Sequence, residues 1–168
     1  MPQAVRSQAV EAFWNAFRAA AGLTHDTYDV VACGDGPAMQ TELAELIVAG
    51  VKRATAGLVR QFGPGGEPPP VPDGYAVVVD GDGRPRAIWR TIEVRTGPLD
   101  SVDERFAWAE GEGERTRDWW LAAHRGYFAR QAAAEGFAMH DGIETVFERF
   151  EVVWPPEIAD SRRGRPAD

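Results

Sequence analysis

Apolar positions recur along the chain at spacings typical of helices in some segments and of strands in others. In residues 7–21, Phe13, Trp14 and Phe17 follow the spacing of one helix face, and Gly22 ends the pattern. The final apolar segment is rich in β-branched and aromatic residues, which favours a strand. The predicted elements are helix 7–21, strand 28–33, helix 37–50, strand 52–58, strands 75–80 and 87–94, a short helix between 101 and 111, helix 116–136 and strand 143–154.

These elements predict a single α+β domain. Strands and helices are mixed without strict β-α-β alternation, which favours a mixed, mostly antiparallel, barrel-like sheet with flanking helices. A chain of 168 residues has the length of one domain. We expect residues 1–27 to form a helical extension, residues 28–154 the domain proper and residues 155–168 a disordered tail.

Charge narrows the classes of partner. The chain carries 18 basic and 26 acidic side chains, a net charge of −8, which disfavours a protein that coats long nucleic acids. A small ligand, or a short single-stranded RNA held by a local basic patch, remains compatible with this charge. No apolar run is long enough to span a membrane, and the N-terminal segment is charged, so we expect a cytoplasmic protein. The oligomeric state cannot be read from the sequence.

Common metal and cofactor motifs are missing. The chain has no HExxH pair, no P-loop and no GxSxG elbow, and its three histidines are scattered. With Cys33 alone, neither a disulfide within the chain nor a cysteine zinc site can form. We therefore predict no metal and no cofactor.

The most informative segment surrounds the single lysine. Lys52 lies in Gly50-Val51-Lys52-Arg53-Ala54-Thr55, between a predicted helix and a predicted strand, and the other 17 basic residues are arginines. This G-x-K-x-x-T pattern resembles the motif of the ASCH domain family. Phe106-Ala107-Trp108-Ala109-Glu110-Gly111-Glu112-Gly113 resembles the family's F-A-x-x-E-G-E-G signature. The ordered set covers residues 28–154; Gly57 and Glu114 depart from the family pattern.

The resemblance implies a PUA-like β-barrel with a cleft beside the motif, and binding of RNA or a nucleoside-type ligand. One small member type hydrolyses the amide of N4-acetylcytidine with a lysine, a threonine and a glutamate, which correspond here to Lys52, Thr55 and Glu110. Glu112 is the rival of Glu110 for the acid–base role. A non-catalytic RNA-binding module and a metal-dependent ribonuclease are the alternatives that the family offers.

Two mechanisms fit these residue types. A desolvated Lys52 can serve as the base that activates the Thr55 hydroxyl. A carboxylate close to Lys52 instead raises the pKa of the lysine, so the glutamate would take the proton and the ammonium would stabilise the oxyanion. On a flat strand, positions 52 and 55 point to opposite faces, so the mechanism requires the chain to turn between them.

In addition to Glu112, arginine, tryptophan and histidine side chains are candidate ligand contacts. Arg53 and Arg90, with Arg60 and Arg86, flank the motif or the central strands and are candidates for a phosphate-binding pocket. Trp89 is a candidate for stacking on a base, although apolar neighbours favour the core for most of the six tryptophans. His124 lies on the predicted helix 116–136, in a region that resembles the closing part of the ASCH pattern.

Overall fold

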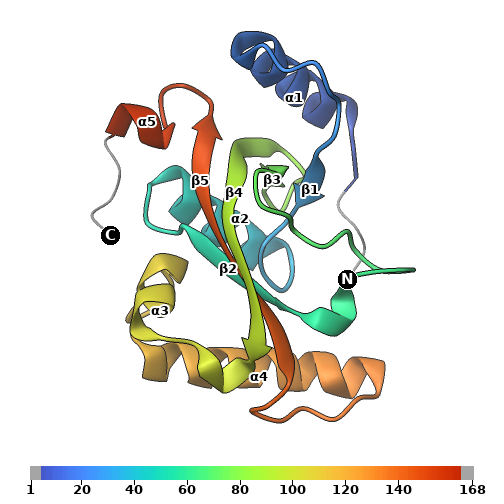
Figure 1. The fold of residues 1–168 in the computed structure, drawn as a ribbon, viewed down its shortest axis with the longest axis vertical. Coiled ribbons are helices and arrows are strands. Elements are labelled where there is room, and N and C mark those ends of the chain that lie inside the picture. Colours follow the sequence, from blue (N-terminus) through green and yellow to red (C-terminus); the bar gives the residue numbers. More distant parts are fainter. Residues whose placement is uncertain (1–4, 164–168) are drawn as a thin grey trace.

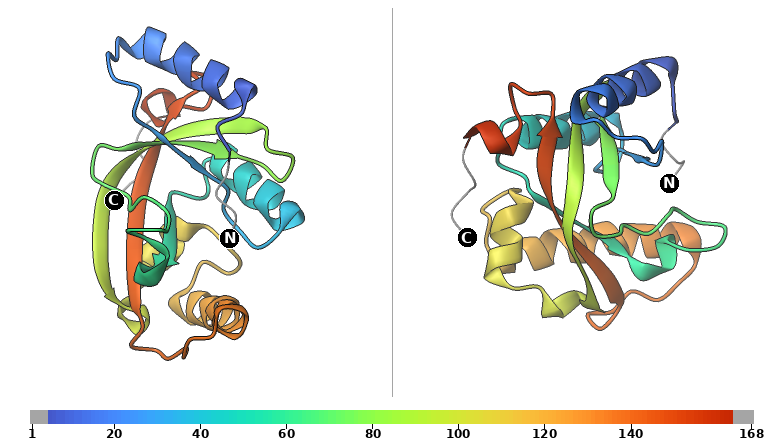
Figure 2. Two further views of the ribbon diagram at one scale, coloured as in Figure 1. Left: turned by 90° about the vertical axis from the view of Figure 1, so that its right-hand side faces the viewer. Right: turned by 45° about the horizontal axis from the view of Figure 1, so that its top comes forward.

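The structure is a curled sheet of five strands with helices around it (Figure 1). It is a computed structural model that describes residues 5–163. β1 (Asp29–Val31) runs parallel to β3 (Tyr75–Val79), and the other neighbouring pairs are antiparallel. The strand order is β1-β3-β4-β5-β2, with β2 (Ala54–Leu58) at the edge beside β5. The long strands β4 (Pro85–Pro98) and β5 (Glu144–Trp154) curl the sheet into a half-barrel (Figure 2). The predicted α+β class with a mostly antiparallel, barrel-like sheet is confirmed.

The N-terminal helix α1 (Gln8–Ala21) packs on one end of the sheet. The Ser7 hydroxyl accepts a hydrogen bond from the backbone amide of Val10 at 3.2 Å and caps the helix. Val10, Trp14 and Phe17 recur at helical spacing and are buried against β3, β4 and Tyr28. This helix extends the core of the domain rather than forming a separate unit.

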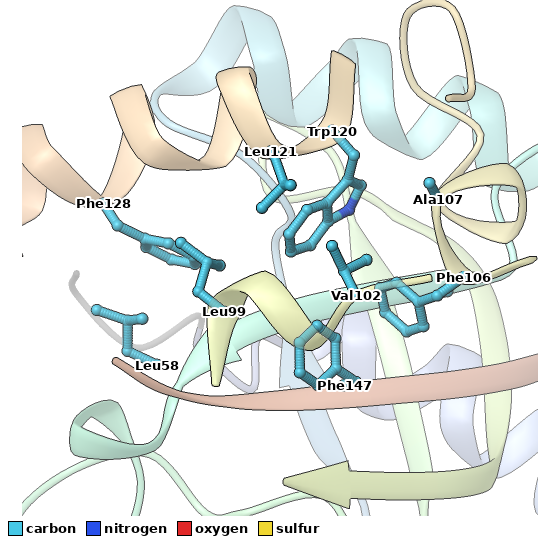
Figure 3. Packing of buried hydrophobic residues seen from close by; sticks show 10 residues of the cluster. Leu58, Leu99, Val102, Phe106, Ala107, Trp120, Leu121, Phe128 and Phe147 are labelled. Carbon is cyan, nitrogen blue, oxygen red and sulfur yellow. The ribbon is translucent and has the colours of Figure 1, made fainter. Parts of the chain in front are cut away.

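Three further helices surround the region in which the predicted site residues lie. These are α2 (Pro37–Val48), α3 (Glu104–Glu110) and α4 (Arg117–Glu135). α2 and α4 lie on the same side of the β4–β5 pair (Figure 2). Trp120, Leu121 and Phe128 of α4 pack with Phe106 of α3 and Phe147 of β5 in a buried apolar cluster (Figure 3). This cluster fixes α3 and α4 on the sheet.

The segment after β5 differs from the expected disordered tail. Residues 155–163 fold back on the domain, and α5 (Asp160–Arg163) begins with a buried aspartate. Asp160 accepts two hydrogen bonds from Arg53, at 2.8 and 2.7 Å, and one from the backbone amide of Val152 at 2.8 Å. The expectation of disorder is therefore wrong for residues 155–163, and residues 164–168 lie outside the described part.

No helix among residues 5–163 has both the length and the apolar character needed to cross a membrane.

Candidate functional site

The turn between α2 and β2 positions the single lysine. β2 (Ala54–Leu58) begins two residues after Lys52, so the side chain of Lys52 does not follow the alternation of side chains between the two faces of a strand. The backbone amides of Val51 and Lys52 both donate to the carbonyl of Leu46, at 3.0 and 3.1 Å. The geometric conflict between positions 52 and 55 is thereby removed.

Two glycines explain the E-G-E-G segment. Gly111 has φ 74°, and a Cβ atom there would lie 2.5 Å from the carbonyl oxygen of Val51. Gly113 has φ 56°, and a Cβ atom there would overlap the indole of Trp119. The chain after α3 therefore passes directly against the turn that carries Lys52, and Glu110 and Glu112 reach it from the two sides of Gly111.

Lys52 and these two glutamates form an acid–lysine cluster. The Lys52 ammonium is fully buried and donates to Glu110 Oε2 at 2.8 Å, to Glu112 Oε2 at 3.0 Å and to the carbonyl of Ala54 at 2.8 Å. Glu110 is equally buried, whereas the side chain of Glu112 is 19% exposed. The structure thus brings together the predicted lysine and both rival glutamates.

The charge of Lys52 is fixed by its neighbours. Burial alone lowers the pKa of the lysine, but the carboxylates of Glu110 and Glu112 outweigh this effect and raise the pKa overall. Burial likewise raises the pKa of Glu110, yet the neighbouring Lys52, Glu112 and His124 bring it well below its usual range. Lys52 and Glu110 are therefore a charged pair at neutral pH, and Lys52 is not a base in this state.

Glu112 behaves differently from Glu110. Burial raises its pKa, Lys52 lowers it, and the neighbouring Glu110 raises it again, so that the pKa of Glu112 is about 7. A carboxyl that titrates near neutral pH both takes up and releases a proton readily. Of the two glutamates, Glu112 is the better candidate for proton transfer.

His124 completes the cluster from α4. Its Nδ1 lies 2.8 Å from the carbonyl oxygen of Trp120, which can only accept, so Nδ1 carries a proton. Its Nε2 points at Glu110 Oε1 across 3.5 Å, and this buried oxygen has no hydrogen-bond partner among the described residues. The imidazole stacks on Trp120 with ring centroids 3.7 Å apart, which fixes its orientation.

Glu110, Glu112 and His124 also offer ligand atoms within 4.8 Å of one another, a spacing compatible with a metal ion. The Lys52 ammonium contacts one oxygen of each carboxylate and already balances part of their charge. The arrangement favours an ammonium-based site over a metal centre.

The acid–lysine cluster lines a cavity of about 400 Å³, which we name the cluster cavity. Thr55 and the half-buried Trp119 line the same cavity. The Thr55 hydroxyl makes no hydrogen bond to another residue within 5–163. Thr55 also lines a second hollow of about 610 Å³, the sheet cavity, which is walled by β1, the loop 62–74 and the side chains of Trp89, Thr91 and Glu148. Thr55 therefore lies between the two cavities.

The predicted arginine contacts do not reach either cavity. Arg53 is buried, bound to Asp160 and to the carbonyls of Ile47 and Lys52, and so supports the turn instead of a ligand. Arg90, on strand β4, pairs with the carboxylates of Glu151 and Asp73. The structure therefore does not bring these two predicted contacts to the cavities, because carboxylates hold their guanidinium groups elsewhere. Arg60 and Arg86 are likewise paired with carboxylates.

Several cavity residues were not predicted. Trp119 was expected in the core but borders the cluster cavity, and Tyr127 and Arg130 of α4 lie beside it. Glu148 was overlooked, although a carboxyl within an apolar strand is itself a signal of a special role. Trp89 is 1% exposed and reaches the sheet cavity as part of its wall, stacked on Phe150.

Comparisons with known proteins agree with this architecture. A family model for the ASCH domain matches residues 29–154. The crystal structure of an ASCH domain from Lactobacillus crispatus JV V101 is 26% identical, with a TM-score of 0.81, over 89% of this chain and 96% of that one. Protein EF3133 from Enterococcus faecalis V583 is 33% identical, with a TM-score of 0.79, over 87% and 88% of the two chains. A search of curated proteins found no match. The chain therefore belongs to the ASCH domain family.

Proposed function

We propose that this ASCH domain protein binds a nucleoside-type ligand beside the G-x-K-x-x-T motif and hydrolyses an amide on a modified pyrimidine, with N4-acetylcytidine as the probe substrate. The observation that carries the proposal is that the acid–lysine cluster and the Thr55 hydroxyl face one cavity. A cationic donor, a carboxyl that titrates near neutral pH and a free hydroxyl are the groups that acyl transfer requires.

The chemistry assigns one role to each group. Glu112, in its ionised form, takes the proton of the Thr55 hydroxyl while the threonine oxygen attacks the acyl carbon. As Glu112 takes up this proton it loses its negative charge and releases the N–H of Lys52 that it had accepted, and the Lys52 ammonium donates that hydrogen to the developing oxyanion. The carbon–nitrogen bond then breaks, Glu112 returns the proton to the departing exocyclic nitrogen, and water hydrolyses the acyl-threonine to release acetate. Glu110 stays ionised and holds the ammonium in place.

Release of cytidine from N4-acetylcytidine, followed by chromatography, tests the proposal. The variant T55V keeps the shape of the side chain without its hydroxyl, and we expect it to lower kcat by roughly 100-fold or more. The matched control is T96V, at an exposed position on β4. Wild-type protein that releases no cytidine, in an assay in which a known amidohydrolase is active, would contradict the proposal.

The family's fold is often linked to RNA binding, and a non-catalytic RNA-binding role is the second candidate. The arginines predicted to bind phosphate are already paired with carboxylates, and the chain's net charge is −8, and both features disfavour tight binding of a phosphate backbone at these positions. Tight RNA binding that weakens with salt, without cytidine release, would favour this candidate. Metal-dependent RNA cleavage would favour a ribonuclease instead.

A further inference from the structure

Glu148 is a buried carboxyl that the proposed reaction does not use. It lies on β5 in the wall of the sheet cavity, with 7% of its surface exposed. One of its oxygens, Oε2, accepts hydrogen bonds from the Trp89 indole at 3.1 Å and from the Thr91 hydroxyl at 2.7 Å. The other oxygen, Oε1, accepts none from the described residues. A buried carboxyl is costly unless its oxygens are satisfied, so one side of Glu148 is available to a ligand.

The position of Glu148 relative to Thr55 is fixed by strand register. Thr55 of β2 and Glu148 of β5 are direct partners in the antiparallel ladder. Side chains of such partners project to the same face with their Cβ atoms roughly 5 Å apart. A group bonded to the acyl carbon at Thr55 therefore comes within reach of Glu148.

The surrounding charges favour an uncharged ligand. The sheet cavity is lined by three carboxyls, those of Asp29, Glu67 and Glu148, and burial raises the pKa of each. The cation in its lining is Arg6, which stacks on the Tyr28 ring and donates to the Tyr28 carbonyl. This environment repels phosphate and suits a nucleoside whose polar edge presents hydrogen-bond donors.

We infer that Glu148 is a specificity-determining residue whose free carboxyl oxygen accepts a hydrogen bond from the exocyclic nitrogen of a cytosine-type base seated in the sheet cavity. The inference rests on the proposed nucleoside function and adds the part of the ligand that is recognised. Cytidine offers an N–H donor at this position, whereas uridine offers a carbonyl oxygen that a carboxylate repels. The protein therefore prefers cytidine to uridine.

The variant E148Q reverses this preference for a structural reason. The Trp89 indole can only donate, so it requires the amide oxygen of the glutamine on its own side. The amide nitrogen then faces the cavity and presents a donor, which suits the carbonyl of uridine. A residue that only supported the fold would alter stability without changing the order of two ligands.

The experiment measures dissociation constants of cytidine and uridine by calorimetry for the wild type, E148Q and E144Q, an exposed control on the same strand. We expect the wild type to favour cytidine by about tenfold or more, E144Q to match it, and E148Q to change the ratio of the two constants by roughly 10- to 100-fold toward uridine. A ratio in E148Q equal to that of the wild type overturns the inference.

The same samples separate this inference from the hydrolytic function. If the wild type hydrolyses N4-acetylcytidine but the ratio does not change in E148Q, the recognition role is overturned and the hydrolase stands. If the ratio changes as expected but no cytidine is released from the acetylated substrate, recognition stands and hydrolysis falls. If the wild type binds neither nucleoside and releases no cytidine, both are overturned.

Discussion

The unusual titration of Glu112 predicts a pH-dependent stability that a single substitution removes. In the folded protein the pKa of Glu112 is about 7, against a usual value of 4.5. The folded state therefore binds this proton more tightly than the unfolded chain. The stability that the folded protein gains by binding this proton is fully present below pH 4.5 and is lost as the pH rises through about 7.

The magnitude follows from the two pKa values. When Glu112 is ionised in both the folded and the unfolded chain, folding is less favourable by roughly 3 kcal/mol than when Glu112 is protonated in both. At pH 5 only about a quarter of this loss has occurred. Between pH 5 and pH 8 the wild type thus loses roughly 2 kcal/mol of unfolding free energy through Glu112. For a domain of this size, that corresponds to a decrease in Tm of about 5–10 °C.

The variant E112Q should remove this decrease. Its amide oxygen can still accept from the Lys52 ammonium, but the side chain no longer titrates. The assay is thermal unfolding of the wild type, E112Q and the exposed neighbour control E114Q at pH 5, 6, 7 and 8. We expect the difference in Tm between E112Q and the wild type to change by about 5–10 °C in favour of E112Q as the pH rises from 5 to 8. The Tm of E114Q should change with pH as that of the wild type does. Parallel curves for the wild type and E112Q would refute the assigned pKa.

The remaining predictions concern the pH profile and two buried contacts. If Glu112 is the base, kcat/KM for N4-acetylcytidine should rise with pH to a plateau, with a midpoint near its pKa of about 7, and a flat wild-type profile would argue against it. The variant K52M leaves Glu110 buried without its partner, so chemical denaturation should show a loss of about 3–5 kcal/mol. D160N removes the charge that pairs with the buried Arg53, so it should lower the free energy of unfolding. A value within about 0.5 kcal/mol of the wild type would show that the fold does not need this ion pair.

Local sequence patterns were sufficient to predict most of the fold. Helix caps such as Ser7, helix-ending glycines and β-rich segments act over a few residues, so the helices and strands could be placed from the chain alone. The resemblance to the ASCH pattern likewise identified Lys52, Thr55 and Glu110, which the structure places around one cavity. These features depend on residues that are close in sequence or on an ordered set of motifs.

The parts that could not be predicted depend on distant partners. Arg53 was a candidate ligand contact because it flanks the motif. Its partner Asp160 could not be foreseen because it lies 107 residues away, in a segment expected to be disordered. Glu148 was missed because its relation to Thr55 arises only from strand register. The difference between Glu110 and Glu112 likewise depends on burial and on the contact of both carboxyls with Lys52, and neither can be read from the sequence.

A crystal structure of the T55V variant soaked with N4-acetylcytidine tests the central claim most directly. We predict that the acetyl oxygen lies within hydrogen-bond distance of Lys52 Nζ, that the acyl carbon faces position 55 and that the base lies in the sheet cavity with its exocyclic nitrogen at Glu148. A ligand bound elsewhere on the protein, or one seated with its acetyl group away from Lys52, would contradict the account.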